Sequence, residues 1–508
     1  MMNSTPVGSW STIPPFSLLP ATLMAHLAPA LGGLAELMLS FCDRQTQADA
    51  SVQRLAEFEE TLAQRLREVG RAMVQWLYND LEPQQREDLP PQVRFDGVFY
   101  QRSDRKTPNR LVATLFGTIT LMRYLYRPIE ERVPGIFPLE LRLGLEAGRA
   151  TPALANQVAQ GAAQDPQQGV LQHLLDHYGV KWSAPLLRKV TASVSVGMSE
   201  HRHEAQVAKL LRLLEQADHS RGSRKPVLAV GRDGIMLPIR KESCFREGAV
   251  ATVSVHDRAG KRLGTVYLGR MPEPLQPILS SQLTALLRDL LERWSGGGNP
   301  MPRLVYITDA GHHPTEYYRR VLCRMAHPRC PQQVLQWEWV LDYYHACEYI
   351  SKVAEVLFRD GDERQRRAWA AKMRRWLKDK PGGIYRVLHS AAARRHGRDL
   401  RGGAGEYRKA YDYLREHIGE LDYHGYRKRH LPIGSGVTEA GCKTVFTQRM
   451  KQSGMTWTLA GGQSVVDLRV IHLSGVWQPV RQAYLQTKDC PELRTQLRQH
   501  YRSCKEVA

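Results

Sequence analysis

The chain has 508 residues, 42% of them hydrophobic, and a formal net charge of +20 at pH 7. This length excludes a single ordinary core and predicts two to four domains, and the apolar content suits a folded soluble protein. The positive charge favours a polyanionic partner, of which nucleic acid is the commonest, with a membrane surface as the competing partner.

The first long apolar stretch covers residues 15–42 and contains Pro20, Pro29 and Glu36. No Lys or Arg precedes Arg44, so the basic region of a signal peptide is missing. We interpret the stretch as an apolar helical segment broken by prolines. No later stretch is apolar enough over a sufficient length to span a bilayer.

The eight cysteines are scattered along the chain, which fits reduced thiols in a bacterial cytosol. Cys323, His327 and Cys330 have the spacing C-x3-H-x2-C, which zinc ligands can show. No clear fourth ligand lies nearby, so we favour a loop with two free thiols over a zinc site.

The N-terminal region, residues 1–90, is predicted to be helical. Residues 48–81 repeat apolar side chains at intervals of three and four, and prolines at 83, 90 and 91 end the pattern. Residues 91–147 form the next segment. Within it, two alternating runs in 110–128 meet around Phe116-Gly117 and predict a β-hairpin.

Residues 148–220 are predicted to be helical and are a candidate for DNA binding. The stretch "QQGVLQHLLDHYGVKWSAPLLRKVTASV" holds a helix, a turn at Gly179 and a second helix that Ser183 can cap, with Pro185 in its first turn. This pattern is typical of a helix-turn-helix, whose second helix would enter the major groove. The alternative is an ordinary helical hairpin.

The pattern changes at Lys225, where residues 225–358 alternate between strands and helices. Three strands follow one another in "KPVLAVGRDGIML", "GAVATVSVHDRAG" and "KRLGTVYLGRMPE". An amphipathic helix, a strand before Asp309, a helix near 314–325 and a strand in "QQVLQWEWVLDYYH" complete the order β-β-β-α-β-α-β. We therefore predict an α/β multidomain protein with an RNase H-like mixed sheet and helices on its faces.

Residues 359–430 interrupt this unit and are predicted to form a basic helical insertion. They contain 20 Lys and Arg against 10 Asp and Glu. Half of the net charge of the chain lies here, so phosphate contact is favoured over an ordinary solvated surface. Aromatic residues are interleaved with the charges at Trp369, Trp376, Tyr411 and Tyr413. Residues 431–480 would return to the core, and 481–508 form a tail.

Three carboxylates have positions that suit one site. Asp233 is predicted to end the first strand of the sheet and Asp309 the fourth, and these two strands are parallel neighbours in an RNase H-like sheet. Two close carboxylates repel each other, and Mg2+ resolves the conflict because it prefers oxygen ligands. Two such ions assist phosphodiester chemistry. Glu439, in the first turn of a helix after a Gly-Ser-Gly loop, is the candidate third acid, unless it only favours the helix N-terminus.

Four motifs, "GRDG", "TDAGHHP", "LDYYHACEYI" and "PIGSGVTEAGCKTVFTQRMKQSGMTW", resemble those of bacterial insertion-sequence transposases of the Kra group. These are DDE enzymes related to Mutator-like transposases, and the resemblance covers roughly residues 90–480. It implies a triad of Asp233, Asp309 and Glu439 with a helical insertion before Glu439. It also implies that Asp342 and His345 form a supporting D-x-x-H signature, in which His345 contacts the scissile phosphate or orients an acid.

We therefore expect a DNA transposase that uses two Mg2+ ions, with Mn2+ as a substitute, held by Asp233, Asp309 and Glu439. Lys443, Arg449 and Lys451 are expected to hold DNA phosphates. The expected partners are terminal inverted repeats and target DNA, with the chain as a homo-oligomer on DNA and no membrane. Two alternatives stay open: an RNase H-like, structure-specific DNA nuclease, and a domesticated DNA-binding protein without catalysis.

Overall fold

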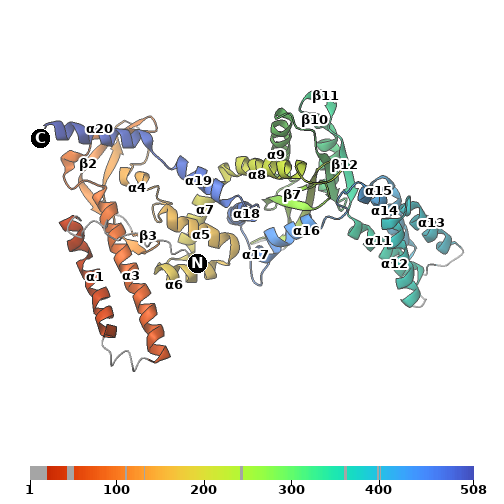
Figure 1. The fold of residues 1–508 in the computed structure, drawn as a ribbon, viewed down its shortest axis with the longest axis horizontal. Helices are drawn as coiled ribbons and strands as arrows, with labels where there is room; N and C mark the ends of the chain where they lie inside the picture. Colours follow the sequence, from red (N-terminus) through yellow and green to blue (C-terminus); the bar gives the residue numbers. More distant parts are fainter. Residues whose placement is uncertain are drawn as a thin grey trace, which may run out of the picture. The chain divides into compact units, whose positions relative to one another are not determined.

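The computed structural model describes residues 20–42, 51–108, 111–130, 132–240, 244–359, 363–396, 400 and 402–507 (Figure 1). The chain divides into two compact units. The first comprises Met1–Gly161, Pro166–Val194 and Leu485–Ala508, and the second comprises Ala162–Asp165 and Ser195–Tyr484. The predicted helical segment 148–220 is thus divided between the units, and the C-terminal tail belongs to the first.

Two helices that pack side by side begin the first unit. Helix α1 (Ala21–Cys42) buries Leu23 and Leu27 against α3 (Val52–Asp80), whose Ser51 cap accepts a hydrogen bond from the Arg54 amide. The prediction that prolines break the first segment is wrong, because α1 continues through Pro29. Of the helices described, α1 is the one whose length and apolar composition would allow it to cross a membrane, a test that signal sequences and core helices also pass.

A three-stranded antiparallel sheet follows, in the order β1-β2-β5. The predicted hairpin at Phe116-Gly117 exists as β3 and β4, but the residues after it form β5 and pair with β2 instead. The sequence analysis missed the hairpin of β1 and β2, although its turn is Asp96-Gly97, both with positive φ. The strands and short helices here are η2 (Arg86–Asp88), β1 (Gln92–Phe95), β2 (Val98–Pro108), β3 (Val112–Thr114), β4 (Gly117–Ile119), β5 (Met122–Pro128) and α4 (Pro138–Arg142).

The predicted helix-turn-helix segment has the expected connectivity. Helix α6 ends at Tyr178, and Gly179 takes a left-handed conformation (φ 62°) that turns the chain before the next helix. Arg188 and Lys189 are exposed on that helix, whereas Leu187 and Val190 are buried. The four helices of this stretch are α5 (Pro152–Gln164), α6 (Gln167–Tyr178), α7 (Ala184–Glu200) and α8 (Arg202–Asp218).

The second unit contains a mixed sheet, as predicted, whose five strands have the order β12-β9-β6-β7-β8. Strand β6 is parallel to β9, β9 is parallel to β12, and β6, β7 and β8 are antiparallel. The elements of this region are β6 (Val227–Pro238), β7 (Phe245–His256), β8 (Arg262–Arg270), α9 (Pro277–Gly296), β9 (Arg303–Thr308), α10 (His312–Arg320), η3 (Leu322–Arg324), β10 (Ala326–His327), β11 (Cys330–Val334) and β12 (Trp337–Leu341).

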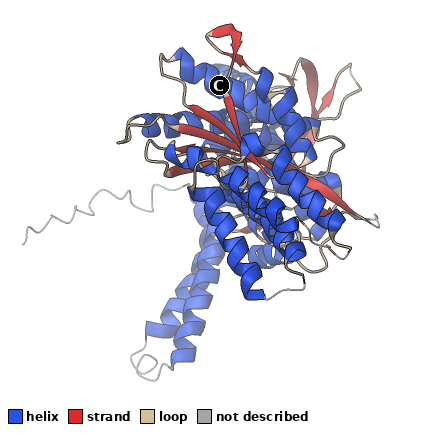
Figure 2. Cartoon of the chain, turned by 90° about the vertical axis from the view of Figure 1, so that its right-hand side faces the viewer, coloured by secondary structure: helices blue, strands red, loops and turns tan. Residues whose placement is uncertain are grey.

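Helices cover both faces of this sheet (Figure 2). One face packs on α8, α9 and α10 through an apolar core that includes Leu228, Val253 and Leu287. The predicted order β-β-β-α-β-α-β of the main elements is confirmed. The prediction of one continuous strand in residues 332–345 is wrong. The structure divides that run into the exposed β11, the buried β12 and the start of α11.

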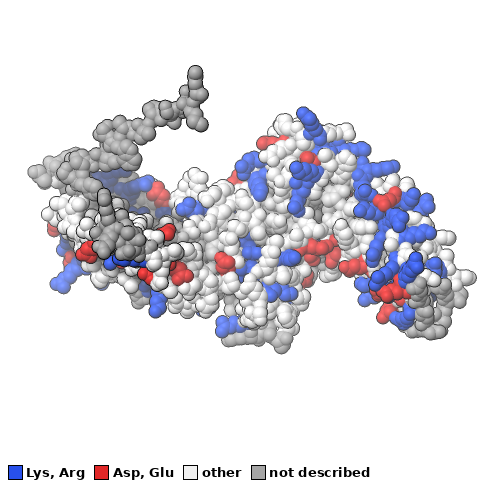
Figure 3. All heavy atoms as spheres, turned by 60° about the horizontal axis from the view of Figure 1, so that its bottom comes forward, with Lys and Arg blue, Asp and Glu red and all other residues white. Residues whose placement is uncertain are grey.

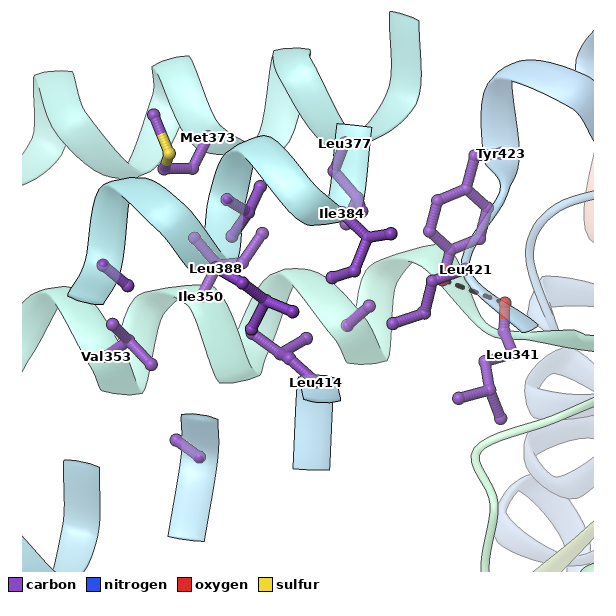
Figure 4. Packing of buried hydrophobic residues seen from close by; sticks show 14 of the residues in the cluster. Leu341, Ile350, Val353, Met373, Leu377, Ile384, Leu388, Leu414, Leu421 and Tyr423 are labelled. Carbon is purple, nitrogen blue, oxygen red and sulfur yellow. Dashed lines mark hydrogen bonds between the residues drawn. The ribbon is translucent and has the colours of Figure 1, made fainter. Parts of the chain in front are cut away.

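The basic insertion is helical, as predicted, and shares one core with the other face of the sheet. Side chains of α11, α12, α13 and α14 point toward one another, and the Tyr423 hydroxyl donates to the Leu341 carbonyl at 3.1 Å (Figure 4). Trp369 is buried in this core, and Trp376, Tyr411 and Tyr413 pack against it, so these aromatics are not part of a basic surface. The helices are α11 (Tyr343–Leu357), α12 (Glu363–Asp379), α13 (Gly383–Arg395), α14 (Ala404–Glu416), η4 (Ile418–Glu420) and α15 (Tyr423–Lys428).

The chain then returns to the sheet. Helix α16 packs on β6 and β7, and a π-helix follows it directly. These C-terminal elements are α16 (Gly436–Cys442), η5 (Lys443–Thr447), α17 (Gln448–Met450), α18 (Leu459–Leu473), α19 (Trp477–Thr487) and α20 (Pro491–Val507). Within the first unit, α20 contacts β1, where Gln496 bonds the backbone of Arg94.

Candidate active site

The register of three adjacent parallel strands points three aspartates to one level, one within β6 and two just past the ends of β9 and β12. Gly231 of β6 is paired with Ile307 of β9, and Thr308 of β9 with Leu341 of β12. When this register continues along the chain, Asp233, Asp309 and Asp342 come opposite one another. Asp309 and Asp342 directly follow the last residues of β9 and β12. Asp233 does not end its strand, contrary to the prediction, because pairing with β7 extends β6 to Pro238.

The carboxylate of Asp233 is partly buried and has a defined set of partners. Its Oδ1 accepts a hydrogen bond from the Gly234 amide at 2.7 Å. Burial raises the pKa of Asp233, the Cys442 thiol and the Gly234 amide lower it, and the charges of Asp309 and Glu247 raise it again. Asp233 and Asp309 are thus close enough to interact, as expected for acids at one edge of the sheet.

Asp309 begins a tight turn. Its Oδ1 accepts a hydrogen bond from the Gly311 amide at 2.9 Å, and Ala310 between them has a φ of 64°. The left-handed conformation costs a non-glycine residue about 1 kcal/mol, so surrounding contacts must stabilise it. One such contact comes from the insertion: the Tyr413 hydroxyl donates to the Asp309 carbonyl at 3.1 Å, and the Tyr413 ring stacks on Tyr349 of α11 at 3.7 Å.

Glu439 reaches this edge because α16 lies close against the sheet. Thr438 and Thr252 of β7 share a hydrogen bond of 2.8 Å between their hydroxyls. A Cβ atom at Gly231 would clash with Thr438, so glycine in "GRDG" permits the close approach. Helix α16 therefore presents Glu439, in its first turn, to the aspartates at the ends of the strands.

A network of hydrogen bonds joins Glu439 to Asp342. Asp342 is 1% exposed and accepts hydrogen bonds from the amides of Tyr344 and Ser435 and from the Ser435 hydroxyl. The same hydroxyl lies 2.6 Å from Oε1 of Glu439. One hydroxyl can donate to only one of the two carboxylates. The hydrogen bond with Asp342 is the main cause that raises the pKa of Glu439, which fits a proton shared between the two acids.

The thiol of Cys442 completes the surroundings of Asp233. Cys442 ends α16 and is 6% exposed. Burial raises the pKa of this thiol, and the charge of Asp233 raises it further. Cys442 is thus a buried hydrogen-bond partner of Asp233.

The acids match Mg2+ in donor type, since carboxylate oxygens are the ligands that this ion prefers. In the described part of the chain, however, no three His, Cys, Asp or Glu side chains are grouped so as to hold a metal ion. Glu439 is instead hydrogen-bonded to Ser435 and Asp342.

The remaining predicted site residues have different positions. His345 packs edge-on to the rings of Tyr349 and Tyr413, and its Nδ1 lies 3.5 Å from Glu348. Among the described residues, no hydrogen bond links His345 to the candidate catalytic acids Asp233, Asp309 and Glu439. Asp342 caps α11, and it also accepts a hydrogen bond from the Ser435 amide.

Of the three predicted phosphate contacts, Lys443 and Lys451 are exposed beyond α16. Arg449 is 1% exposed, its Nε donates to the Ala162 carbonyl at 3.0 Å, and its guanidinium lies over the Trp457 ring. Burial is the main cause that lowers the pKa of Arg449, to about 10. The prediction that Arg449 binds DNA does not agree with this position.

Ser435, whose hydroxyl links Asp342 and Glu439, was not predicted as a site residue. The Gly-Ser-Gly loop before Glu439 was the available signal. Tyr413 and Cys442 were not predicted as neighbours of the aspartates, and the contact of Tyr413 joins residues more than a hundred positions apart in the chain. No model of a known protein family matches this chain, and no curated protein matches its sequence.

Proposed function

We propose that the chain is a DNA transposase with an RNase H-like catalytic unit, similar to insertion-sequence transposases of the Kra group. The observation that carries the proposal is that Asp233, Asp309 and Glu439, which are far apart in the sequence, lie along one edge of a single sheet, where the charge of Asp309 raises the pKa of Asp233 and the charge of Asp233 raises the pKa of Glu439. Structural ion pairs or caps alone give no reason for four acids to gather at this edge, because like charges repel.

The strand order supports the same proposal. Three antiparallel strands followed by two parallel strands on the side of the first give the order β12-β9-β6-β7-β8, which is the RNase H-like order. In that arrangement the first and fourth strands carry two acids and a later helix carries the third. Here β6, β9 and α16 supply these positions, and α12 to α15 form the insertion between the second and third acids.

The proposed reaction has two steps. Water attacks a phosphodiester at the end of the element, so that a bond from oxygen to phosphorus forms and the bond to the 3′-oxygen breaks, which leaves a 3′-hydroxyl and a 5′-phosphate. That hydroxyl then attacks a target phosphodiester, which exchanges one phosphodiester bond for another and needs no added energy source. Mg2+ or Mn2+, when bound, would supply a more acidic water and charge neutralisation at phosphorus.

The chain's own residues would prepare this chemistry. Asp233, Asp309 and Glu439 are the proposed ligands of two ions. The Gly234 amide and the Cys442 thiol donate hydrogen bonds to Asp233 and partly offset the effect of burial on its pKa, and Ser435 and Asp342 hold Glu439 at the edge of the site. Lys443 and Lys451, which follow Glu439 and are exposed, are placed to hold phosphates of the bound DNA.

The proposed partners are the terminal inverted repeats and the target DNA, with the chain acting as a homo-oligomer in the bacterial cytoplasm at the nucleoid. The candidate reader of the repeats is the helix-turn-helix of α6 and α7. Two rivals remain. A nuclease on the same fold would cleave DNA without joining it. A domesticated DNA-binding protein is favoured by one observation, that the acids of the described residues are not grouped around a metal position.

The decisive experiment incubates the full chain with DNA ends and Mg2+, and then with DNA that carries a free 3′-hydroxyl and a target plasmid. We expect nicked product and joined product from the natural sequence and neither from Asp309→Asn. The matched control is Asp412→Asn, on the insertion and ion-paired with Arg415, which should keep both activities. Nicking without joining would identify the nuclease, and equal nicking by the Asp309 variant would remove Asp309 from the chemistry.

A further inference from the structure

The second unit contains a large hollow at the edge of the sheet opposite the acids. Its volume is ≈ 1090 Å³. It lies where the parallel strands begin, since Lys225 precedes β6, Arg303 begins β9 and Glu338 is in β12. Its lining includes Arg224, Lys225, Arg303, Gln336, Glu338 and Arg429.

The lining of this hollow is strongly basic. Four cationic side chains, Arg224, Lys225, Arg303 and Arg429, face one carboxylate, Glu338, which leaves an excess of three positive charges. Glu338 binds both Arg303, at 2.5 Å, and Arg429. One carboxylate therefore fixes the orientation of two guanidinium groups but neutralises only one of them. Arg224 and Lys225 are exposed at the rim.

The hollow is well separated from the candidate active site. Arg303 begins β9 and Asp309 directly follows its last residue, so a rise of about 3.3 Å per residue separates the two by about 20 Å. A phosphate bound at Arg303 is consequently not the phosphate that lies at the acids. The hollow needs a different explanation from the active site.

The chemistry of the lining favours nucleic acid over a protein partner. None of the residues that line the hollow is Trp, Tyr or Phe, although aromatic anchors are typical of protein interfaces, from which Lys is depleted. Exposed Arg and Lys with neutral donors such as Gln332 and Gln336 are instead typical of contacts to phosphate. An acidic protein partner would be bound through the Arg and Lys side chains and would give Gln332 and Gln336 no particular role in recognition.

We propose that this hollow binds the phosphate backbone of duplex DNA, as a second contact remote from the reacting phosphate. The identity of the polyanion rests on the proposed function, but the binding does not depend on catalysis. Arg224 and Lys225 at the rim contact phosphates, and the Arg303–Glu338–Arg429 group gives the contact a fixed shape.

The test measures binding of the full chain carrying Asp309→Asn to a fluorescent duplex in EDTA, by anisotropy, between about 50 and 200 mM salt. The test variant is Arg224→Glu with Lys225→Glu. The matched control is Arg212→Glu with Arg288→Glu, which makes the same change in charge at exposed positions of α8 and α9 in the same unit. Each lost phosphate contact lowers the slope of log K against log salt by about 0.9.

We expect the test variant to lose about 1.8 from the slope and at least about tenfold in affinity relative to the control. Equal slopes and affinities for the two variants would overturn the proposal. Polyglutamate that competes as well as DNA, and does so through Arg224 and Lys225, would also overturn it in favour of an acidic protein. Failure of the proposed function is seen separately, as absence of Mg2+-dependent cleavage by the natural sequence, and leaves the result in EDTA unaffected.

Discussion

Gly231 of β6 and Thr438 of α16 are in direct contact, because a Cβ atom at Gly231 would clash with Oγ1 of Thr438 and lie 3.1 Å from its Cβ. Thr438 is in turn hydrogen-bonded to Thr252 of β7. The close packing of α16 on the sheet, and with it the position of Glu439, thus depends on glycine at position 231, two residues before Asp233.

Gly231→Ala should therefore displace α16 and reduce cleavage by moving Glu439. The clash involves a side chain that is held by a hydrogen bond, so we expect the free energy of unfolding to fall by about 1–3 kcal/mol. The measurement is urea denaturation together with Mg2+-dependent nicking. Gly405→Ala is the control, since a Cβ there meets no atom within 4 Å. A Gly231 variant with the stability and activity of this control would contradict the account of how α16 packs on the sheet.

Asp342→Ala should destabilise the protein more than loss of a helix cap alone. Asp342 caps α11 and also accepts hydrogen bonds from the amide and the hydroxyl of the buried Ser435. Asp422→Ala is the matched control, because the exposed Asp422 caps α15 and its loss should cost about 1 kcal/mol. The Asp342 variant should cost about 1–3 kcal/mol more, owing to the unpaired Ser435 groups. Equal losses in denaturation curves would show that the link to Ser435 contributes nothing.

The stability of the chain should fall as the pH is lowered through about 6.5, in part because of His256. Burial lowers the pKa of His256 from 6.5, more than the hydrogen bond to the Gly260 carbonyl raises it. The unfolded state then binds a proton before the folded state does, so the free energy of unfolding decreases as the solution becomes more acidic.

His256→Gln should make this decrease shallower, as measured by thermal unfolding between pH 7 and about pH 5. The exposed His219, changed to Gln, provides the control and should leave the slope as it is. An unchanged slope in the His256 variant would show that this histidine does not contribute to the pH dependence of stability.

Arg449→Ala should affect mainly the stability of the protein, whereas Lys451→Ala should affect mainly DNA binding. Arg449 is buried and bonded to the Ala162 carbonyl, so its loss should lower the free energy of unfolding by about 1–3 kcal/mol. Lys451 is exposed, so its loss should change stability by less than about 0.5 kcal/mol and reduce the salt slope of DNA binding by about 0.9. A stable Arg449 variant with weakened DNA binding would restore the role first predicted for it.

Much of the fold follows from local sequence pattern. Alternation and apolar runs predicted β6, β7, β8 and β9, and the order of elements in the second unit follows from them. The helices of the insertion follow from a 3.6-residue period with charged faces. Such signals are local, because a strand or helix buries one face at a fixed spacing.

Other features were decided by partners that are distant in the chain. Strand β6 continues past Asp233 because β7 pairs with it as far as Pro238, and Arg449 is buried because Ala162 offers it a carbonyl. The turn at Asp96-Gly97 had a local signal that was overlooked. Prolines were expected to break the first helix, yet α1 continues through Pro29 and packs on α3.

The sequence by itself determined which residues carry charge: acids at 233, 309, 342 and 439, and an excess of positive charge. Only the tertiary structure decided which of these charges meet. The strand register sets three aspartates at one level, Gly231 admits α16, and Ser435 ties Glu439 to Asp342. The physical reason is that hydrogen bonds and close contacts act over a few ångströms, whereas these residues are up to about two hundred positions apart.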